Sequence, residues 1–301
     1  MREYLVWLAK LVTVFVVVGV FFVAILGSIS AVVMTVADDV ELDGKAKEGK
    51  HKVAVIELTG EIQDSKETLK QLHKQIGDEA INGIVLRVDS PGGVVGPSQE
   101  IYQAVKRLKE LKPIVASYGA LAASGGLYAS IGATKIVAQP GTLTGSIGVL
   151  MQFPNFTDVA SKVGATMITI KSGKLKDAGN PFRQMSIDDQ EYLQSVVGNV
   201  YEDFIKAISE SRKIDPERVK QFGDGRILTG SQAKDLGLVD DFGDVYTAAE
   251  EVLKIKGIKL EAGEAPTLVY PKEKFKEFRE LMHWANEWKG RLSPGAKLKA
   301  L

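Results

Sequence analysis

An uncharged, largely apolar segment near the N-terminus places the strongest constraint on how this chain can fold. Residues Leu11 to Ala37 read LVTVFVVVGVFFVAILGSISAVVMTVA and contain no charged side chain. A helix of about 20 apolar residues spans a bilayer, whereas buried core helices are shorter and carry polar residues on one face. We therefore expect residues 1–37 to form a single transmembrane anchor. It should stay uncleaved, because the apolar run continues beyond Ser28 and Ser30, the small residues of a cleavage-type site.

The charges around this segment favour an orientation with the N-terminus inside. Arg2 and Lys10 precede the segment as a short basic region, which is how export signals begin. Lysines also follow it closely, so positive charge alone does not fix the orientation. We expect a single-pass protein of the cell membrane with an extracytoplasmic large domain. A charged, glycine-containing linker at residues 38–52 would join the two.

Beyond residue 52, short β-branched runs alternate with helical patterns. Such alternation is typical of parallel strands buried on both faces, so it predicts an α/β domain, which we place at residues 53–262. The expected strands are Val53–Leu58, Gly83–Asp89, Pro113–Ser117, Lys135–Ala138 and Thr166–Ile170. The expected helices of this part are near Lys66–Ile76, Pro97–Leu111, Ser124–Ile131 and Asn155–Val163.

The pattern after Pro181 is helical. Ser186 and Asp189 have the spacing of a capping box, and a long helix from Ile187 to about Arg212 should follow them. Further helices are expected to start at Asp215-Pro216, to run from Ser231 to Gly237, and to run from Asp244 to Lys256.

The C-terminal tail, residues 263–301, has an amphipathic pattern of its own. Its apolar stripe at helical spacing consists of Phe275, Phe278, Met282, Ala285, Trp288 and Leu292. The stripe predicts a tail helix that packs on its own domain or on a neighbouring subunit. The alternative is an interfacial helix that lies on the membrane.

Composition excludes several kinds of chemistry. The chain has no cysteine, so it can form no disulfide, no catalytic thiolate and no cysteine-ligated zinc site. Its formal net charge is zero, whereas nucleic-acid-binding proteins normally carry a basic excess. We therefore expect no nucleic acid among its partners.

Three glycine-rich junctions follow expected strands, at the ends where open α/β sheets place their ligand sites. They are Asp89-Ser90-Pro91-Gly92-Gly93, Ala122-Ala123-Ser124-Gly125-Gly126 and Thr144-Gly145-Ser146-Ile147-Gly148. In the second, small residues let a substrate carbonyl approach Ser124 at the positive end of a helix. In the first, a Pro-Gly-Gly turn exposes N–H groups that can hold an oxyanion. The alternatives are a serine that merely caps the helix and an ordinary turn that needs glycine.

A serine nucleophile needs a general base. None of His51, His73 and His283 lies at a glycine-rich junction, so a histidine base is poorly supported. A neutral lysine is the alternative, provided that burial or neighbouring positive charge lowers its pKa well below about 10.4. Three candidates follow the last expected strand, namely Lys171, Lys174 and Lys176. From spacing alone, a solvated loop of lysines is the simpler interpretation.

Five motifs occur along the chain in a fixed order. They are Asp-Ser-Pro-Gly-Gly at 89–93, Ala-Ser-Gly-Gly at 123–126, Thr-Gly-Ser-Ile-Gly-Val at 144–149, Lys-Ser-Gly-x-x-Lys-Asp at 171–177, and Asp-Gly-Arg at 224–226 followed by Gly-Leu-Val-Asp at 237–240. Together they resemble signal peptide peptidases of the SppA type, over about residues 50–250 and the N-terminal anchor. Leu127 departs from the family pattern, because an aromatic residue usually follows the two glycines.

The resemblance implies an α/β fold of the crotonase and Clp-protease type, with a repeated β-β-α core and a helical C-terminal part. It implies Ser124 as the nucleophile and Lys176 as the general base of a serine-lysine dyad, with Ser146 orienting the lysine amine. The backbone N–H groups of Gly93 and Gly125 would form the oxyanion hole. No cofactor and no metal are expected.

The resemblance further implies a membrane-anchored endopeptidase that degrades signal-peptide remnants and other apolar peptides through an acyl-enzyme. Its other expected partners are membrane lipid and further copies of the chain, in a ring or dome whose adjacent subunits can share each dyad. One rival is a membrane protease of the NfeD type, but no second apolar run of spanning length follows the protease domain. The other rival is a crotonase-like acyl-binding protein or scaffold, which leaves the serine and lysine motifs unexplained.

Overall fold

The computed structural model describes residues 50–271, in which eight strands form one sheet. The strands are β1 (Lys52–Thr59), β2 (Ile81–Ser90), β3 (Ile114–Ala123), β4 (Lys135–Ala138), β5 (Leu143–Gly145), β6 (Ile227–Thr229), β7 (Asp241–Phe242) and β8 (Thr267–Val269). Their order is β6-β5-β3-β2-β1-β8, while β4 pairs with β3 and β7 outside this path. Every pair is parallel except β5 with β6. The expected mixed α/β fold with a parallel sheet is therefore confirmed.

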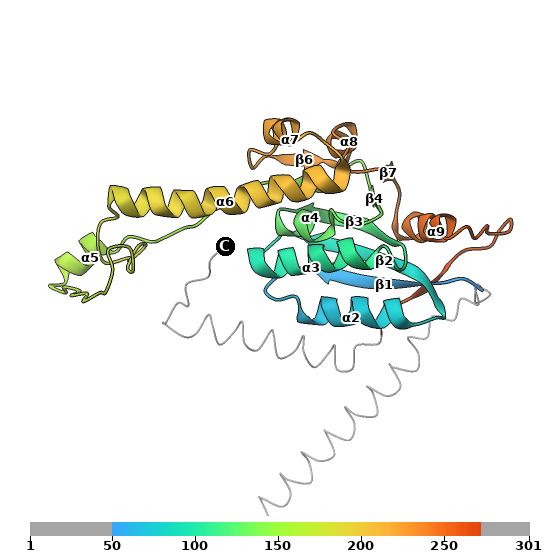
Figure 1. The fold of residues 1–301 in the computed structure, drawn as a ribbon, viewed down its shortest axis with the longest axis horizontal. Helices are drawn as coiled ribbons and strands as arrows, with labels where there is room; N and C mark the ends of the chain where they lie inside the picture. The colour runs from blue at the N-terminus through green and yellow to red at the C-terminus, as the bar shows by residue number, and fades with distance from the viewer. Residues whose placement is uncertain (1–49, 272–301) are drawn as a thin grey trace, which may run out of the picture. The chain divides into compact units, whose positions relative to one another are not determined.

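Helices cover both faces of the sheet (Figure 1). They are α2 (Lys66–Gly77), α3 (Val95–Leu108), α4 (Gly125–Ser130), α5 (Thr157–Lys162), α6 (Ile187–Arg212), α7 (Pro216–Phe222), α8 (Gly230–Asp235) and α9 (Val245–Ile255). In β2, Leu86 belongs to the core under α2, α3 and α4, whereas its neighbour Val85 packs with α9 on the other face. This double burial explains why the strands read as unbroken apolar runs.

Four of the five expected strands are present as β1 to β4, and the connections between them each contain one helix. The helices expected in this part are present as α2 to α5, and those expected after Pro181 as α6 to α9. The capping box of α6 is confirmed, since the Asp189 N–H donates to Ser186 Oγ and the Ser186 N–H donates to the Asp189 carboxylate. Asp215 caps α7 as expected. Helix α8 is capped by Thr229, two residues before the serine expected to begin it.

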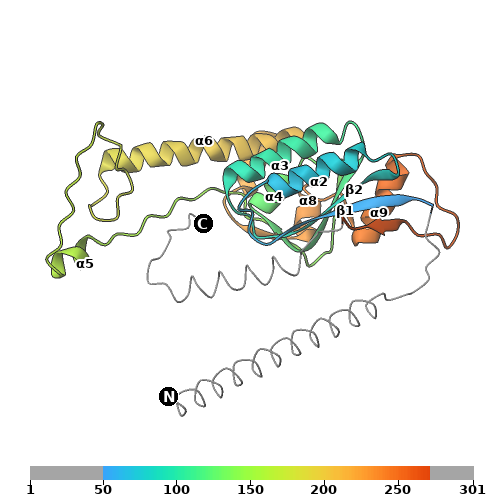
Figure 2. The same ribbon diagram turned by 90° about the horizontal axis from the view of Figure 1, so that it is seen from below.

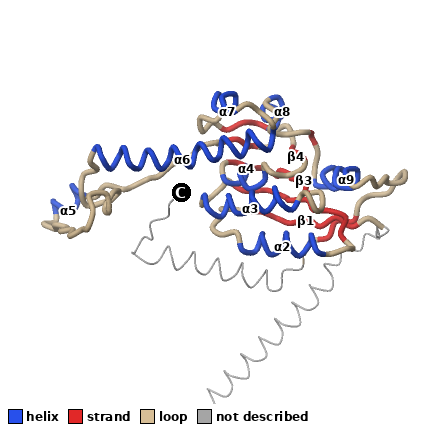
Figure 3. Tube along the Cα trace, viewed as in Figure 1, coloured by secondary structure: helices blue, strands red, loops and turns tan. Residues whose placement is uncertain are grey.

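The fifth expected strand, Thr166–Ile170, is wrong. These residues form an exposed loop, and the side chains of Ile168 and Ile170 are 81% and 93% exposed. β-Branched residues favour a strand where a neighbouring strand completes the ladder, and no strand within residues 50–271 pairs with this segment. The segment belongs to residues 151–186, here called the arm. Figures 1, 2 and 3 show the arm as loops with the short α5, beside the end of α6 that lies away from α4.

Several expectations concern residues outside the described range of 50–271. The transmembrane anchor at 1–37, nearly all of the linker at 38–52 and the apolar stripe of the tail fall there. Within the described range, no helix combines the length and the apolar character needed to cross a bilayer. Strand β8, Thr267–Val269, joins the sheet by pairing with β1. This strand lies beyond residue 262, where the sequence analysis places the end of the peptidase domain.

Candidate active site

The three glycine-rich junctions meet at the carboxyl ends of β2, β3 and β5. Ser90 of β2 is paired with Ala122 of β3, and Ala123 is paired with Gly145 of β5. The third junction follows β5, a strand of three residues that the sequence did not predict, rather than Lys135–Ala138. Because these strands are parallel neighbours, their ends bring the junctions together at one edge of the sheet, as in other open α/β ligand sites.

A bulge in β3 adjusts where this strand ends. Between two matched pairs, β3 advances from Tyr118 to Ala122 while β2 advances only from Val88 to Ser90. Asp89 supports the extra residues, because its Oδ1 accepts the Leu121 N–H at 3.1 Å. Bulges of this kind occur beside active sites, where they change the direction of a side chain.

Ser124 has a backbone conformation that side-chain-bearing residues rarely adopt, with φ 50° and ψ −120°. Its N–H donates to the Gly145 carbonyl at 2.9 Å, and its own carbonyl accepts the Tyr128 N–H, which starts α4. The Ser124 hydroxyl makes no capping hydrogen bond and has no partner within residues 50–271. The helix-cap interpretation therefore does not explain this serine, whereas strain of this kind accompanies functional sites.

The first and second junctions approach so closely that only glycine fits between them. A Cβ on Gly92 would lie 2.6 Å from the Gly125 nitrogen and 2.9 Å from Ser124 Cβ. A Cβ on Gly125 would lie 3.0 Å from the Gly93 nitrogen. Within the described chain, the N–H groups of Gly93 and Gly125 have no hydrogen-bond acceptor. Two N–H donors without an acceptor in this part of the chain thus lie beside Ser124. The glycines are required here because the two junctions are in close contact, and not only because a turn needs them.

Ser146 shares the unusual backbone of Ser124, with φ 49°. Its N–H donates to the Arg226 carbonyl at 2.7 Å, which ties the third junction to the loop before β6. The same loop contains Asp224, whose carboxylate accepts hydrogen bonds from the Arg226 guanidinium. These bonds lower the pKa of the Asp224 carboxyl to about 2. Two serines held in positive-φ conformations therefore stand at the ends of adjacent strands, β3 and β5.

Both serines line one cavity of about 780 Å³. Its lining consists of Glu61, Pro91, Gly92, Gly93, Val95, Ser124, Ser146, Ile147, Gly148, Val149, Leu150, Gln194, Val197, Gly198, Tyr201, Gly223, Asp224 and Gly225. No lysine and no histidine of residues 50–271 is among them. His51 precedes β1 and His73 lies on α2, while His283 is outside the described residues. The cavity thus holds a serine without a lysine or histidine base from the described part of its own chain.

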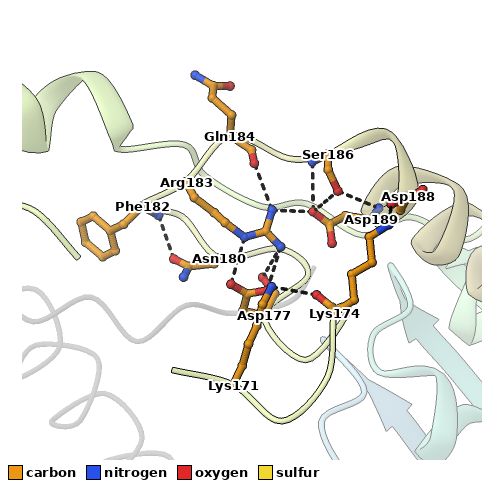
Figure 4. A network of polar contacts seen from close by, with 10 residues as sticks. All are labelled: Lys171, Lys174, Asp177, Asn180, Phe182, Arg183, Gln184, Ser186, Asp188 and Asp189. Carbon is orange, nitrogen blue, oxygen red and sulfur yellow. Dashed lines mark hydrogen bonds and ion pairs between the residues drawn. The ribbon is translucent and has the colours of Figure 1, made fainter. Parts of the chain in front are cut away.

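The three candidate lysines lie on the arm and differ in their partners, and Figure 4 shows two of them, Lys171 and Lys174, close to the start of α6. Lys171 pairs with Asp177, and Lys174 pairs with Asp188. The hydrogen bond that Lys174 donates to the Asp188 carboxylate raises the pKa of Lys174, which favours its charged form. Lys176 is exposed and has no ion-pair partner within residues 50–271. Lys171 and Lys174 are thus engaged in ion pairs, whereas Lys176 forms none in the described chain.

Arg183 fastens the loop that carries these lysines to the start of α6. Its guanidinium donates to Asp177, with Nε–Oδ2 and Nη2–Oδ1 distances of 3.0 and 2.9 Å, and it also donates to Asp189 (Figure 4). These bonds hold the pKa values of both carboxyls well below their usual range. Arg183 was missed at the sequence level. A signal was nevertheless present, because Asp177 ends the lysine motif and Asp189 belongs to the capping box.

We expect Arg183→Ala to reduce kcat by about 100-fold, because a looser loop would displace Lys176, the expected general base, by an ångström or more. The measurement is peptide hydrolysis at neutral pH, with the exposed Arg218 of α7 changed to alanine as the matched control. Both aspartate pKa values are lowered, so these pairs are at full strength above about pH 4 and weaken only as the pH falls further. An unchanged kcat would show that the loop is held in another way.

The chain matches the family model of peptidase family S49 over residues 106–259. A putative protease of Synechocystis sp. is 40% identical over 223 residues, which are 73% of this chain and 80% of the relative. A putative protease of Methanocaldococcus jannaschii is 31% identical over 265 residues, 83% of this chain and 84% of the relative. A putative signal peptide peptidase SppA of Enterococcus faecium is 39% identical over 189 residues, 62% of this chain and 55% of the relative.

The matched range includes two of the three junctions and the lysine loop, and the first junction lies just before it. The family match and the relatives identify a hydrolase that acts on peptides, so the non-peptidase interpretation is set aside. The chain belongs to peptidase family S49, the family of SppA-type signal peptide peptidases, and it is a serine peptidase.

Proposed function

We propose that this enzyme cleaves peptides with a serine-lysine dyad in which Ser124 is the nucleophile and Lys176 the general base. The observation that carries the proposal is the placement of Ser124. Its hydroxyl has no partner among the described residues, its backbone is held at φ 50°, and it opens into the cavity beside two unused N–H donors.

In the proposed reaction, Ser124 Oγ attacks the carbonyl carbon of the peptide bond, and its proton passes to the neutral amine of Lys176. The N–H groups of Gly93 and Gly125 donate hydrogen bonds to the oxyanion that forms, and each donor stabilises the transition state by roughly 3–4 kcal/mol. The C–N bond then breaks, and the lysine returns the proton to the leaving amine. Water, deprotonated by the same lysine, hydrolyses the acyl-enzyme.

Ser146 is proposed to orient the lysine amine. It lines the same cavity as Ser124, and its hydroxyl has no partner within residues 50–271. A hydroxyl can accept a hydrogen bond from an amine while leaving the nitrogen lone pair available for the nucleophile. This would hold Lys176 in line with Ser124.

The dyad is proposed to be shared between adjacent subunits of a homo-oligomer. The cavity has no lysine from the described chain, and the arm with its lysines lies beside the end of α6 that is remote from α4 (Figures 1 and 2). None of residues 151–186 is buried. The arm exposes eleven large apolar side chains, namely Met151, Phe153, Phe156, Val159, Val163, Met167, Ile168, Ile170, Leu175, Phe182 and Met185. An apolar segment of this size marks a surface for another chain, and a second copy that accepts it would bring Lys176 to Ser124.

Apolar peptides, including remnants of signal peptides, are the proposed substrates. The cavity wall has aliphatic side chains at Val95, Ile147, Val149, Leu150 and Val197, which suit apolar residues of an extended peptide. The relative from Enterococcus faecium is named as a putative signal peptide peptidase. An N-terminal anchor at residues 1–37, with the catalytic domain outside the cytoplasm, would place the cavity near such substrates.

A labelling experiment tests this function. The full-length protein in lipid nanodiscs is treated with a fluorophosphonate probe and digested, and the adduct is mapped by mass spectrometry. We expect one labelled serine, Ser124, together with hydrolysis of fluorogenic peptides that have apolar residues before the cleaved bond. Hydrolysis that persists after labelling, or a label on another residue, would contradict the proposal.

A further inference from the structure

Ser90, the last residue of β2, is completely buried and bonds to two loops at once. Its Oγ donates to the Gly60 carbonyl at 2.6 Å and accepts the Gly92 N–H at 3.1 Å. Gly60 belongs to the loop after β1, and Gly92 belongs to the Pro-Gly-Gly turn. A single buried hydroxyl therefore joins the turn to the loop beneath it.

Backbone bonds complete this connection and fix the direction of the Gly93 N–H. The Ile62 N–H donates to the Gly92 carbonyl at 2.8 Å, and the Val94 N–H donates to the Ile62 carbonyl at 2.8 Å. In a trans peptide, the C=O and the following N–H point in opposite directions. Because the Gly92 carbonyl points at Ile62, the Gly93 N–H points away from it. Ser90 holds the preceding Pro91–Gly92 peptide through the Gly92 N–H, and its Oγ also lies 3.5 Å from the Gly92 carbonyl oxygen, which belongs to the peptide that carries this donor.

Ser90 also touches the element that carries the other donor. A Cβ on Gly126 would lie 2.8 Å from the Ser90 carbonyl oxygen and 3.2 Å from Ser90 Cβ, so the first turn of α4 rests on this serine. Gly125, whose N–H is the second donor, is the preceding residue. Ser90 is thus in contact with both backbone segments that lie beside Ser124.

We propose that Ser90 is a positioning residue that sets the spacing and direction of the two oxyanion donors. It touches no substrate, and its hydroxyl acts through Gly92, the residue that precedes the first donor. The inference rests on the proposed function of these donors. It goes beyond that function by assigning the alignment of the donors to one buried side chain.

Ser90→Ala is expected to lower kcat on the order of 10- to 100-fold, less than outright removal of a donor, with KM changed by less than about threefold. Ser117→Ala is the matched control. Ser117 is equally buried, lies on β3 and accepts a hydrogen bond from Arg87 at 2.9 Å, away from the Pro-Gly-Gly turn. We expect both variants to lose a similar amount of thermal stability, and only Ser90→Ala to lose activity.

A transition-state analogue separates alignment from general damage. The affinity for a peptide aldehyde, whose adduct places an oxyanion between the donors, should fall by the same factor as kcat/KM in Ser90→Ala. The affinity for the same peptide with a reduced, uncleavable amide should not change. If Ser90→Ala does not fold, Ser90→Cys fills the same space with a weaker hydrogen-bonding group and should show a smaller loss of the same kind.

Equal kcat losses in the Ser90 and Ser117 variants, or an unchanged aldehyde affinity, would overturn the inference. The failure of the proposed function has a different signature, because wild type and Ser124→Ala would then hydrolyse peptides at the same rate. An inactive Ser124→Ala together with a fully active Ser90→Ala removes only the role of Ser90.

Discussion

Ser124→Ala is expected to lower kcat for a fluorogenic apolar peptide by about 10⁶-fold, as in serine peptidases that lose their nucleophile. No other described hydroxyl combines a positive-φ backbone at the end of β3 with two unused N–H donors beside it. The measurement is the initial rate of hydrolysis with the full-length protein in nanodiscs. The same sample should lose its reaction with a fluorophosphonate.

A control variant shows that such a loss is specific. Ser195→Ala removes an exposed hydroxyl of α6 that bonds only to the Tyr192 carbonyl, and it should retain wild-type kcat. Ser124→Ala should keep the wild-type Tm within a few degrees, because the hydroxyl makes no hydrogen bond in the described chain. Residual hydrolysis above about one hundredth of the wild-type rate would place the nucleophile elsewhere.

Lys176→Ala is expected to lower kcat by about 10⁴-fold, the upper range for removal of a general base. Lys171→Ala and Lys174→Ala should stay within about tenfold of wild type, because these lysines are engaged with Asp177 and Asp188 and serve as anchors of the loop. All three variants change one lysine of the same loop to alanine, so each is a matched control for the others. Equal losses in the three would indicate that net charge or loop folding, and not one base, supports activity.

Local patterns were enough to predict most of the core. The apolar runs that became β1 to β4 are buried on both faces, and their helices begin close to where caps and periodicity indicate. The glycine-rich junctions were also recognisable, because Gly92 and Gly125 stand where any side chain would collide with the other junction. Requirements of this kind restrict the residue type at a position, so they can be recognised in the sequence.

Other features depend on contacts between residues that are distant in the sequence, so local patterns do not predict them. Strand β5 has three residues and exists because it pairs with both β3 and β6. The bulge in β3 depends on Asp89, which lies on the neighbouring strand. The choice among the lysines could not be made from spacing. Asp177 and Asp188 engage two of the three, which supports our proposal of Lys176 as the base.

The error at Thr166–Ile170 has a physical lesson. The β-branched residues of this segment indicate a buried strand, yet Ile168 and Ile170 are exposed in the described chain. A sequence pattern indicates that apolar side chains are buried, but it does not indicate whether the residues that bury them belong to the same chain. A second subunit is the cover that our proposal provides for the arm.

Mixing two inactive variants tests the shared dyad most directly. Ser124→Ala and Lys176→Ala proteins are combined in equal amounts, dissociated and reassembled, and peptide hydrolysis is measured. If each site takes its serine from one subunit and its lysine from the next, about a quarter of the wild-type rate should return, because half of each component is intact in a randomly mixed ring. A mixture that stays as inactive as its components, although subunit exchange is demonstrated, would place both residues of each dyad in one chain and contradict this account.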